Sequence, residues 1–566
     1  MPPDFEIFSP EDADETQVFP ETPTARLTLY IISSIIPLLG AKDKTVRYRA
    51  TQIIAHIVNS LDSIDDELYH MIRQGLLKRL RDKEPNVRIQ AVTGLARLVG
   101  NQADDGEEEH DGSLALLEKL IEIIQHDTSA EVRKTLLLNL PLTSSTLPYL
   151  LERARDLDAA TRRALYSRLL PTLGDFRHLS LSMREKLLRW GLRDRDENVR
   201  KATGKLFHER WIEDCAGGTN ATQGGSVSQV SPPNTLALLE LLERIDVVNS
   251  GMEGGVAHEA MRSFWEGRPD YREDVVFDET FWDDLTAESA FLARSFNEFC
   301  RLESDGNFES LADERMPEVT ALTYFLQKYS FTLIERIKHN NDNGEGNEET
   351  MENEFIVEQL LHIALTLDYS DEVGRRKMFS LLRENLAVPE LPEECTKLTV
   401  EVLRCVCGPD AAGENEFCSV VLEAVAEVHD AIVSDDSFMS ARSELSDDSS
   451  SPSKDHRSRS RSETPGEGEE VPFNKEEAKA KILREMMINM KCLHIAQCML
   501  QNVEGNLQQN MHLVTMLNNL VVPAVRSHEA PIREKGLECL GLCCLLDKVS
   551  SFQQRRLENC PSNDPT

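Results

Sequence analysis

The 566-residue sequence is poor in aromatic residues and in features that would direct a chain into or across a membrane. Aromatic residues make up 6% of the chain, while Leu, Ala, Glu and Arg are plentiful, and this composition favours helices over a β-sandwich. No run of 18 apolar residues is present, so we expect no membrane span. Residues 1–23 are acidic and contain no apolar h-region, which argues against a secretory signal.

Sequence signatures of catalysis and of cofactor binding are also missing. There is no phosphate-binding loop, and neither a nucleophile paired with a base nor a carboxylate dyad stands out. Cys492, His494 and Cys498 are close in sequence but lie in an apolar helical run, which favours core packing over a metal site. The sequence therefore predicts a protein that is not an enzyme and that uses no metal, no cofactor and no small-molecule substrate.

Positive charge is scarce overall but unevenly distributed. The chain has 62 Lys and Arg against 98 Asp and Glu, a formal net charge of −36, which alone argues against a nucleic-acid binder. Residues 24–215 nevertheless hold 30 basic and 28 acidic residues, and six of those acids lie in one loop, 101–112. The acidic excess therefore belongs to other parts of the chain.

A short phrase recurs along the sequence, with an Asp in a turn followed five residues later by Val-Arg or a close equivalent. Its first five copies place Val46, Val87, Val132, Thr161 and Val199 at successive spacings of 41, 45, 29 and 38 residues. Most of these spacings are close to the 40–47 residues of HEAT and armadillo repeats. Weaker copies follow around Val373 and Ile532.

The phrase indicates how one repeat is built. The Asp can accept backbone hydrogen bonds in the turn, and the Val opens a second amphipathic helix. The Arg after the Val can reach the Asp of its own or of a neighbouring repeat, so we interpret Arg88, Arg133 and Arg200 first as parts of an Asp–Arg ladder. Stacking of such helix pairs predicts an all-α HEAT-repeat superhelical solenoid with disordered insertions.

Composition shifts divide the chain into seven predicted segments. They are a disordered acidic N-terminus (1–23), an N-terminal HEAT array (24–214), a flexible loop (215–233), a continued helical array with a polar insertion near 340–354 (234–434), a disordered Ser/Arg/acidic linker (435–472), further HEAT repeats (473–548) and an atypical tail (549–566).

Basic residues of the N-terminal array cluster at the repeat turns and at helix starts. Equivalent positions of stacked repeats line up, so these side chains are predicted to form a stripe that contacts the phosphate backbone without reading bases. The alternative is an ordinary solvated charged face. The candidates are Lys42, Lys44, Arg47, Arg49, Lys78, Arg79, Arg81, Lys83, Arg88, Arg133, Lys134, Arg195, Arg200 and Lys201.

The linker 435–472 carries candidate phosphorylation sites. Ser451 begins a Ser-Pro-x-Lys sequence and Thr464 precedes a proline, and both patterns suit proline-directed kinases. Phosphorylation would add about −1.5 to −2 charges at each site. The alternative is a passive spacer.

Three stretches together resemble a known family. "MIRQGLLKRLRDKEPNVRIQAVTGLARLV", "LLRWGLRDRDENVRKATGKLFHERWIE" and "ERMPEVTALTYFLQKYS" are similar to the HEAT-repeat G-type non-SMC subunit of condensin, in its fungal form. The resemblance implies a nuclear, chromosome-bound and non-catalytic subunit that pairs with the kleisin subunit, meets the SMC ATPases through the complex and holds double-stranded DNA. Family members are close to twice this length, so a C-terminally shortened chain is expected.

A function of another class remains open. A HEAT solenoid can also be a transport receptor or a phosphatase scaffold that binds peptides and no DNA. The concentration of positive charge within 24–215 favours the DNA-binding interpretation, since a peptide-binding scaffold has no need of it.

Overall fold

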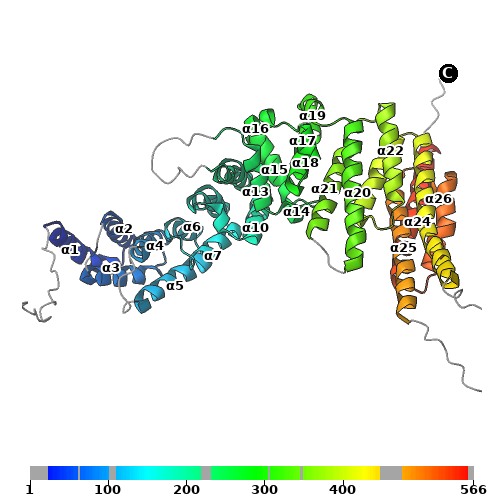
Figure 1. The fold of residues 1–566 in the computed structure, drawn as a ribbon. Helices are drawn as coiled ribbons and strands as arrows, with labels where there is room; N and C mark the ends of the chain where they lie inside the picture. Colours follow the sequence, from blue (N-terminus) through cyan, green and yellow to red (C-terminus); the bar gives the residue numbers. More distant parts are fainter. Residues whose placement is uncertain are drawn as a thin grey trace, which may run out of the picture. The chain divides into compact units, whose positions relative to one another are not determined.

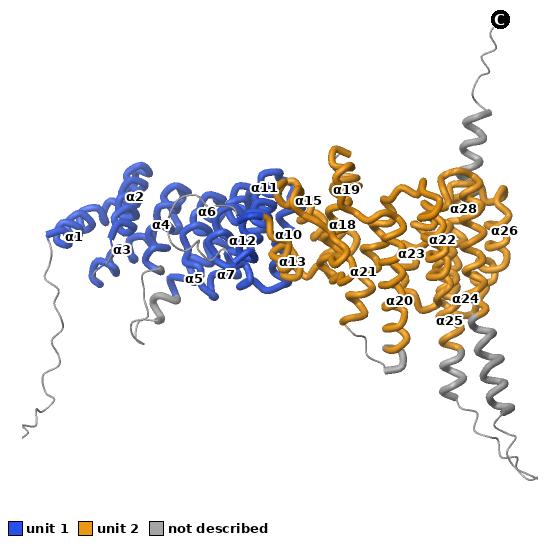
Figure 2. The backbone as a smooth tube through the Cα atoms, turned by 45° about the horizontal axis from the view of Figure 1, so that its top comes forward, with its two compact units in different colours: residues 1–232 blue, residues 233–566 orange. Residues whose placement is uncertain are grey.

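The computed structural model describes residues 23–61, 64, 66–100, 110–217, 231–303, 306–343, 348–445 and 475–558. These residues form an all-helical HEAT-repeat solenoid, as predicted, with no strand among them (Figure 1). The chain divides into two compact units, residues 1–232 (unit 1) and residues 233–566 (unit 2), which are drawn in separate colours in Figure 2.

Unit 1 consists of five helix pairs, which we call repeats 1 to 5. Repeat 1 is α1 (Pro23–Ile35) with η1 (Ile36–Gly40), followed by α2 (Lys44–Ser60). The other pairs are α3 (Asp66–Arg79) with α4 (Pro85–Gly100); α5 (His110–His126) with α6 (Ala130–Asn139); α7 (Leu147–Leu151) and η2 (Glu152–Arg155) with α8 (Ala159–Ala164), η3 (Leu165–Leu169) and α9 (Leu170–Thr172); and, after η4 (Phe176–His178), α10 (Leu181–Leu192) with α11 (Glu197–Lys205), η5 (Leu206–Trp211) and α12 (Ile212–Cys215).

The second helices of successive repeats pack directly on one another, α2 on α4, α4 on α6, α6 on α8 and α8 on α11. Small residues permit this close approach. A Cβ added to Gly94 of α4 would lie 2.8 Å from Leu76 Cδ1 and 3.4 Å from the Cα of Ala55 in α2. Apolar positions at helical spacing fill the core, including Val87, Ala91 and Leu95, each at most 1% exposed.

Unit 2 continues the helix-pair architecture. Helices α18, α21, α23, α25 and α28 pack in succession, and α20, α22 and α24 pack beside them. Its elements are α13 (Thr235–Arg244), α14 (Val247–Ser250), α15 (Val256–Gly267), α16 (Pro269–Asp274), α17 (Glu279–Asp283), α18 (Ala287–Glu298), η7 (Phe299–Glu303), α19 (Glu309–Arg315), α20 (Val319–Asn343), α21 (Glu348–Ala364), α22 (Glu372–Leu386), α23 (Glu393–Cys407), α24 (Ala411–Leu445), α25 (Lys475–Gln501), η8 (Leu507–Gln509), α26 (Met511–Met516), η9 (Leu517–Val521), α27 (Val522–Val525) and α28 (Ala530–Glu558).

Several helix boundaries differ from those expected from composition. Helix α24 continues to Leu445, past the expected array end at 434, and α28 continues to Glu558, past 548. Charged and serine-rich ends of long helices keep their backbone hydrogen bonds within the helix, which composition alone does not reveal. Ser451 and Thr464 lie outside the described residues.

One stretch meets the length and composition of a membrane-crossing helix, contrary to our expectation that none would. Pro23–Gly40, which covers α1 and η1, reaches that threshold although Arg26 and several hydroxyl residues interrupt it, and 11% of it is buried. Its Ile32 and Leu39 pack into the core of repeat 1.

Candidate nucleic-acid interface

The turn between the two helices of each repeat is held by carboxylates. In repeats 2 to 5 the Asp of the phrase accepts a hydrogen bond from the amide two residues ahead, at 2.7–3.1 Å. A second Asp caps the following helix in three repeats, for example Asp196, which accepts from the amides of Asn198 and Val199. The sequence thus forms the turn locally, and the phrase Asp is left with oxygen lone pairs directed at its neighbour.

The arginine that follows the Val-type residue donates hydrogen bonds to the phrase Asp of the next repeat. Repeats 1 to 4 each send a guanidinium to the phrase Asp of the following repeat with two parallel hydrogen bonds. The pairs, with their Nε and Nη2 distances to the carboxylate oxygens, are Arg47–Asp82 (2.8 and 3.0 Å), Arg88–Asp127 (2.8 and 2.8 Å), Arg133–Asp156 (2.8 and 2.6 Å) and Arg162–Asp194 (2.6 and 2.8 Å).

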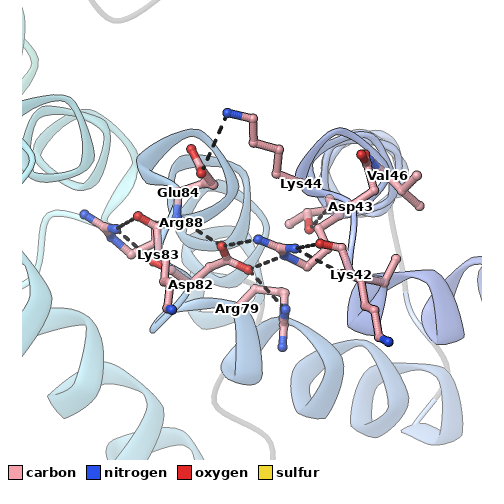
Figure 3. A network of polar contacts seen from close by, with 12 residues as sticks. Lys42, Asp43, Lys44, Val46, Arg79, Asp82, Lys83, Glu84 and Arg88 are labelled. Atoms are coloured by element: carbon pink, nitrogen blue, oxygen red, sulfur yellow. Dashed lines mark hydrogen bonds and ion pairs between the residues drawn. The ribbon is translucent and has the colours of Figure 1, made fainter.

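Each ladder arginine also binds its own turn, so both repeats are joined through one side chain. Arg88 Nη1 donates to the carbonyl of Asp82 at 2.9 Å, while the Asp82 carboxylate accepts from Arg47 of repeat 1 and from Arg79 at 3.1 Å (Figure 3). Arg200 of repeat 5 makes the same turn contact, to the Asp194 carbonyl at 2.7 Å.

Pairing outweighs burial in setting the charge of the ladder carboxylates. Burial raises the pKa of Asp82, Asp156 and Asp194, but hydrogen bonds from the ladder arginines and from turn amides, together with the arginine charge, hold each pKa below its usual value. The same hydrogen bonds raise the pKa of Arg47, Arg133 and Arg162. The pairs Arg47–Asp82, Arg133–Asp156 and Arg162–Asp194 are therefore ionised at neutral pH.

The ladder gives three of the predicted phosphate ligands a structural role. The sequence interpretation of Arg88 and Arg133 as ladder residues agrees with this, whereas Arg200, the third residue so interpreted, donates to the backbone carbonyl of its own turn, and Arg47 takes part in the ladder although it was not so interpreted. The side chains of Arg47, Arg88 and Arg133 are 15, 11 and 10% exposed and are bound to carboxylates. Arg79 is similarly tied to Asp82, with its side chain 20% exposed. Arg47, Arg88 and Arg133 join neighbouring repeats, Arg79 supports Asp82 within repeat 2, and all four have little guanidinium surface left for a phosphate.

Other predicted ligands, of which Lys134 is half-buried and the rest are exposed, already have a polar partner at the surface. Lys44 lies 3.9 Å from Glu84, Lys134 3.5 Å from Glu131 and Lys201 2.6 Å from Glu197. Arg49 donates to Gln52. Surface pairs of this kind contribute about 0–1 kcal/mol and are screened by salt, so a polyanion can displace them.

The remaining cations gather next to the ladder Asp. We call this set the turn edge; it comprises the exposed residues immediately before or after the phrase Asp position, namely Lys42, Arg81, Lys83, Arg155, Arg193 and Arg195. Stacking of repeats places equivalent turns in succession. In the part of the chain that the structure describes, the side chains of Lys42, Arg81, Lys83 and Arg195, and that of Lys78 nearby, form no ion pair.

Sequence reasoning missed two basic residues that occupy positions equivalent to those of the predicted ligands. Arg155 precedes Asp156 as Arg81 precedes Asp82, and its guanidinium lies 5.7 Å from the Trp190 ring centroid. Arg163 is exposed and follows the ladder arginine as Lys134 and Lys201 do. Alignment of the complete turn, rather than of the Val-Arg pair alone, was the signal that could have found them.

The predicted stripe divides around the ladder in repeats 1 and 2. Figure 3 shows Lys42, Arg79 and Lys83 extending to one side of Asp82, whereas Lys44 extends to the other side toward Glu84. In repeats 1 and 2 the turn-edge lysines and the lysine at the helix start therefore lie on opposite sides of the ladder.

The described residues contain no cluster suited to a metal ion. His494 Nε2 contacts the Glu393 carbonyl at 3.0 Å and Cys498 Sγ at 3.6 Å, inside the packed helix α25. Burial raises the pKa of the Cys492 and Cys498 thiols to about 12, so both are protonated.

Comparison with known proteins gives consistent matches. The chain is 40% identical to condensin complex subunit 3 of Schizosaccharomyces pombe over 92% of its own length and 30% identical to that of Saccharomyces cerevisiae over 94%. Residues 491–557 match the family model "Nuclear condensing complex subunits, C-term domain". The chain spans about half the length of these relatives, 55% and 51%.

A solved structure supports the same assignment. The crystal structure of the S. pombe condensin Cnd3-Cnd2 subcomplex aligns with a TM-score of 0.69 and 37% identity, over 95% of this chain and 57% of that chain. The resemblance seen in the sequence is therefore confirmed, and this chain is a HEAT-repeat homologue of condensin complex subunit 3.

Proposed function

We propose that this chain is a non-catalytic condensin subunit that binds a kleisin partner and the backbone of double-stranded DNA in the nucleus, and so contributes to chromosome condensation. Homology to condensin subunit 3 over most of the chain supports the membership in such a complex. The homologous S. pombe chain was solved in a subcomplex with Cnd2, which supports a kleisin partner. SMC ATPases would be reached through the complex.

The turn edge is the observation that carries the DNA contact. Its six cations occupy equivalent positions of repeats 1, 2, 4 and 5, and the carboxylates beside them, Asp82, Asp156 and Asp194, are already neutralised by the ladder. Packed helices lie about 8–10 Å apart, so the cations of repeats 1 and 2, and those of repeats 4 and 5, are close enough to contact nearby phosphates of one DNA strand. Such an array binds without base specificity.

The ladder also makes the array rigid. Lys42 and Lys83 sit on turns whose backbone carbonyls are bound by Arg47 and Arg88. A cation on a fixed turn loses less conformational entropy on binding than one on a mobile loop. We therefore assign phosphate contact to Lys42, Lys78, Arg81, Lys83 and Arg195 first, with Lys44, Arg49, Lys134, Arg200 and Lys201 as peripheral contributors.

The test is a binding titration of duplex DNA, about 30 base pairs long, with the chain co-purified with its kleisin partner. The charge-reversal variant is Lys42→Glu with Arg81→Glu and Lys83→Glu. The matched control carries the same charge change on exposed residues of unit 2, Lys338→Glu with Arg376→Glu and Lys377→Glu.

We expect affinity for DNA to fall steeply with salt, and the turn-edge variant to lower the slope of log K against log salt by about one for each lost contact. The unit 2 control should change that slope little. Binding that is undetectable or insensitive to salt would instead favour a peptide-binding scaffold.

A further inference from the structure

We propose that residues 1–22 of this chain cover an apolar end face of repeat 1 and place their carboxylates beside the cations of that repeat. The end face comprises Leu27 and Tyr30 of α1 and Val46 and Ile53 of α2, which are 58, 72, 39 and 43% exposed. Residues 1–22 precede α1 directly and lie outside the described residues.

Comparison of the five repeats shows that this face uses positions that are buried in the other repeats. The Val-type residue of the phrase is at most 1% exposed in repeats 2 to 5, at Val87, Val132, Thr161 and Val199. The equivalent residue of repeat 1, Val46, is 39% exposed. The same position is therefore a core position wherever a described repeat precedes it.

Helix α2 exposes a second position of this kind. Gly94 of α4 faces Ala55 of α2, at 3.4 Å from its Cα to an added Cβ, so this position contacts the preceding repeat. Its equivalent in α2, counted from the Val-Arg pair, is Ile53, which is 43% exposed. In addition, Ala41 stands where repeats 2 to 5 have the ladder Asp, so repeat 1 has no acceptor for an incoming arginine.

Helix α1 extends the apolar surface. Leu27 and Tyr30 are one turn apart and share a face, and the stretch Pro23–Gly40 is apolar enough to match a membrane span while only 11% of it is buried. Water contact with so much apolar surface is unfavourable by roughly 25 cal/mol for each Å². Apolar side chains exposed in this number on one repeat favour an interaction site.

Length and connection make residues 1–22 a suitable occupant. They contain Phe5, Ile7, Phe8, Val18 and Phe19, which can fill an apolar face. An extended chain of 22 residues reaches roughly 70 Å, whereas the 17 residues of α2 span roughly 25 Å. The covalent connection at Pro23 also gives the segment a high effective concentration at this face.

Charge selects this segment over a second copy of the chain. Residues 1–22 contain seven Asp and Glu and no Lys or Arg. Repeat 1 exposes Arg26, Lys42 and Arg49, whereas Lys44 is directed at Glu84 of repeat 2. A symmetric dimer through this face would bring those cations against themselves, whereas the acidic segment neutralises them.

The cap would also influence DNA binding, and that consequence rests on the proposed function. Lys42 belongs to the turn edge, so carboxylates beside it would compete with phosphate, and removal of residues 1–22 would raise DNA affinity. The cross-linking readout below contains no DNA, so failure of the cap and failure of the DNA contact are distinguishable.

The test places a photo-reactive benzoylphenylalanine at Phe8 of the full chain and maps cross-links by mass spectrometry. We expect intramolecular cross-links to α1 and α2. Ile53→Asp should reduce their yield to background, and because Ile53 is already 43% exposed the variant should still fold. Leu157→Asp, at a leucine that is 90% exposed in the turn of repeat 4, should leave the yield unchanged.

A second measurement guards against poor cross-linking chemistry. Replacement of Phe5, Ile7 and Phe8 by Ser should increase hydrogen exchange in α2, compared with the unaltered chain. Cross-links between two chains, cross-links that persist in Ile53→Asp, or unchanged exchange would overturn the proposal. Flotation with anionic lipid vesicles that depends on Leu27 and Tyr30 would assign the face to a membrane instead and would also overturn it.

Discussion

Units 1 and 2 share a helix-pair architecture but join their helix pairs by different interactions. In unit 1 each repeat is bound to the next by a bidentate Arg–Asp pair. In unit 2 the copy of the phrase at Val373 has Gly374 at the position of the ladder arginine, and Arg375 pairs with Glu372 of its own helix. The copy at Ile532 keeps the turn contact of Arg533 to the Ser527 carbonyl.

Aromatic packing replaces the ladder in the first half of unit 2. Trp265 and Phe277 each contact Phe296 edge-on at 5.4 Å, and Trp282 stacks on Phe325 at 5.9 Å. Buried polar contacts between α18 and the helix pair that follows supplement the aromatic packing, such as Arg294 to Gln359 at 2.9 Å. Local sequence can therefore repeat while the interaction between repeats changes.

This difference follows the distribution of charge. The ladder consumes acids in unit 1, where 35 acidic and 30 basic residues are nearly balanced, whereas unit 2 has 63 acidic and 32 basic residues. An ion-pair ladder neutralises carboxylates along the turns and leaves neighbouring cations available. Aromatic packing has no such effect on neighbouring charges, and the turn edge lies in unit 1.

The largest expected effect is in the aromatic core of unit 2. Trp265→Ala removes a side chain that is 0% exposed and that donates to Ser295 Oγ at 3.2 Å. We expect the free energy of unfolding of unit 2 to fall by about 4–5 kcal/mol with little dependence on salt. Denaturant unfolding followed by circular dichroism measures this loss, and an unchanged unit 2 transition would contradict the role of the cluster.

Breaking the ladder should have a somewhat smaller effect, confined to unit 1. Asp156→Ala leaves Arg133 buried without its carboxylate, and we expect a loss of about 3 kcal/mol in the unfolding free energy of unit 1. The double variant Arg133→Met with Asp156→Leu should recover most of that loss, because an apolar pair avoids the cost of burying charge. No recovery would mean that the Asp acts through its turn hydrogen bond.

The ladder should make the free energy of unfolding of unit 1 depend on pH in the acidic range. The folded-state pKa of Asp82, Asp156 and Asp194 lies below the unfolded value of 3.8, so their contribution is present above that value and is lost as pH falls through the folded pKa. We expect the free energy of unfolding of unit 1 to fall below about pH 4. Asp156→Asn should flatten that dependence, and an unaltered acid profile would contradict it.

Unit 2 should respond to pH in the opposite direction through Glu358. Burial, followed by the charges of Glu354 and Glu394, raises the pKa of Glu358 to about 7. Because its unfolded value is 4.5, the folded state is favoured below that value and loses stability as pH rises through 7. Glu358→Gln should therefore stabilise unit 2 by about 1–2 kcal/mol at about pH 8 and have little effect near pH 4. Exposed Glu348→Gln is the matched control.

The smallest effect is expected at a surface pair of unit 1. Lys201→Ala removes the 2.6 Å contact with Glu197, both side chains of which are more than half exposed. We expect the unfolding free energy to change by less than about 0.5 kcal/mol and the salt slope of DNA binding to fall by about one at most. A stability loss as large as that of Asp156→Ala would remove the distinction between ladder and surface pairs.

Much of the fold could be predicted because its signals are local. The Asp of each turn, the Val that follows and the apolar positions at helical spacing act within one repeat, and they predict a stack of helix pairs. The choice of acceptor could not be predicted, since the phrase allowed Arg88 to pair with Asp82 or with Asp127. Stacking decided that the Arg88 guanidinium pairs with the carboxylate of Asp127, 39 residues ahead, and donates to the backbone carbonyl of Asp82.

Only part of the candidate site could be predicted from the sequence, for the same reason. Basic residues were listed from the sequence by proximity to the turns, but exposure depends on what a neighbouring repeat presents. Arg133 and Lys134 are adjacent in sequence, yet one is buried in the ladder and the other lies at the surface. Arg155 and Arg163 are recognised as equivalent to the predicted ligands only when all positions of the turn are aligned.

The sequence by itself determined the repeating unit, the placement of charge along the chain and the family to which it is similar, because these depend on residue type and spacing. Tertiary structure alone decided which arginines are bound, which cations remain exposed and which apolar side chains of repeat 1 are exposed among the described residues. The physical reason is that a guanidinium or an apolar face is satisfied by groups that are tens of residues away and become neighbours only when the helix pairs stack.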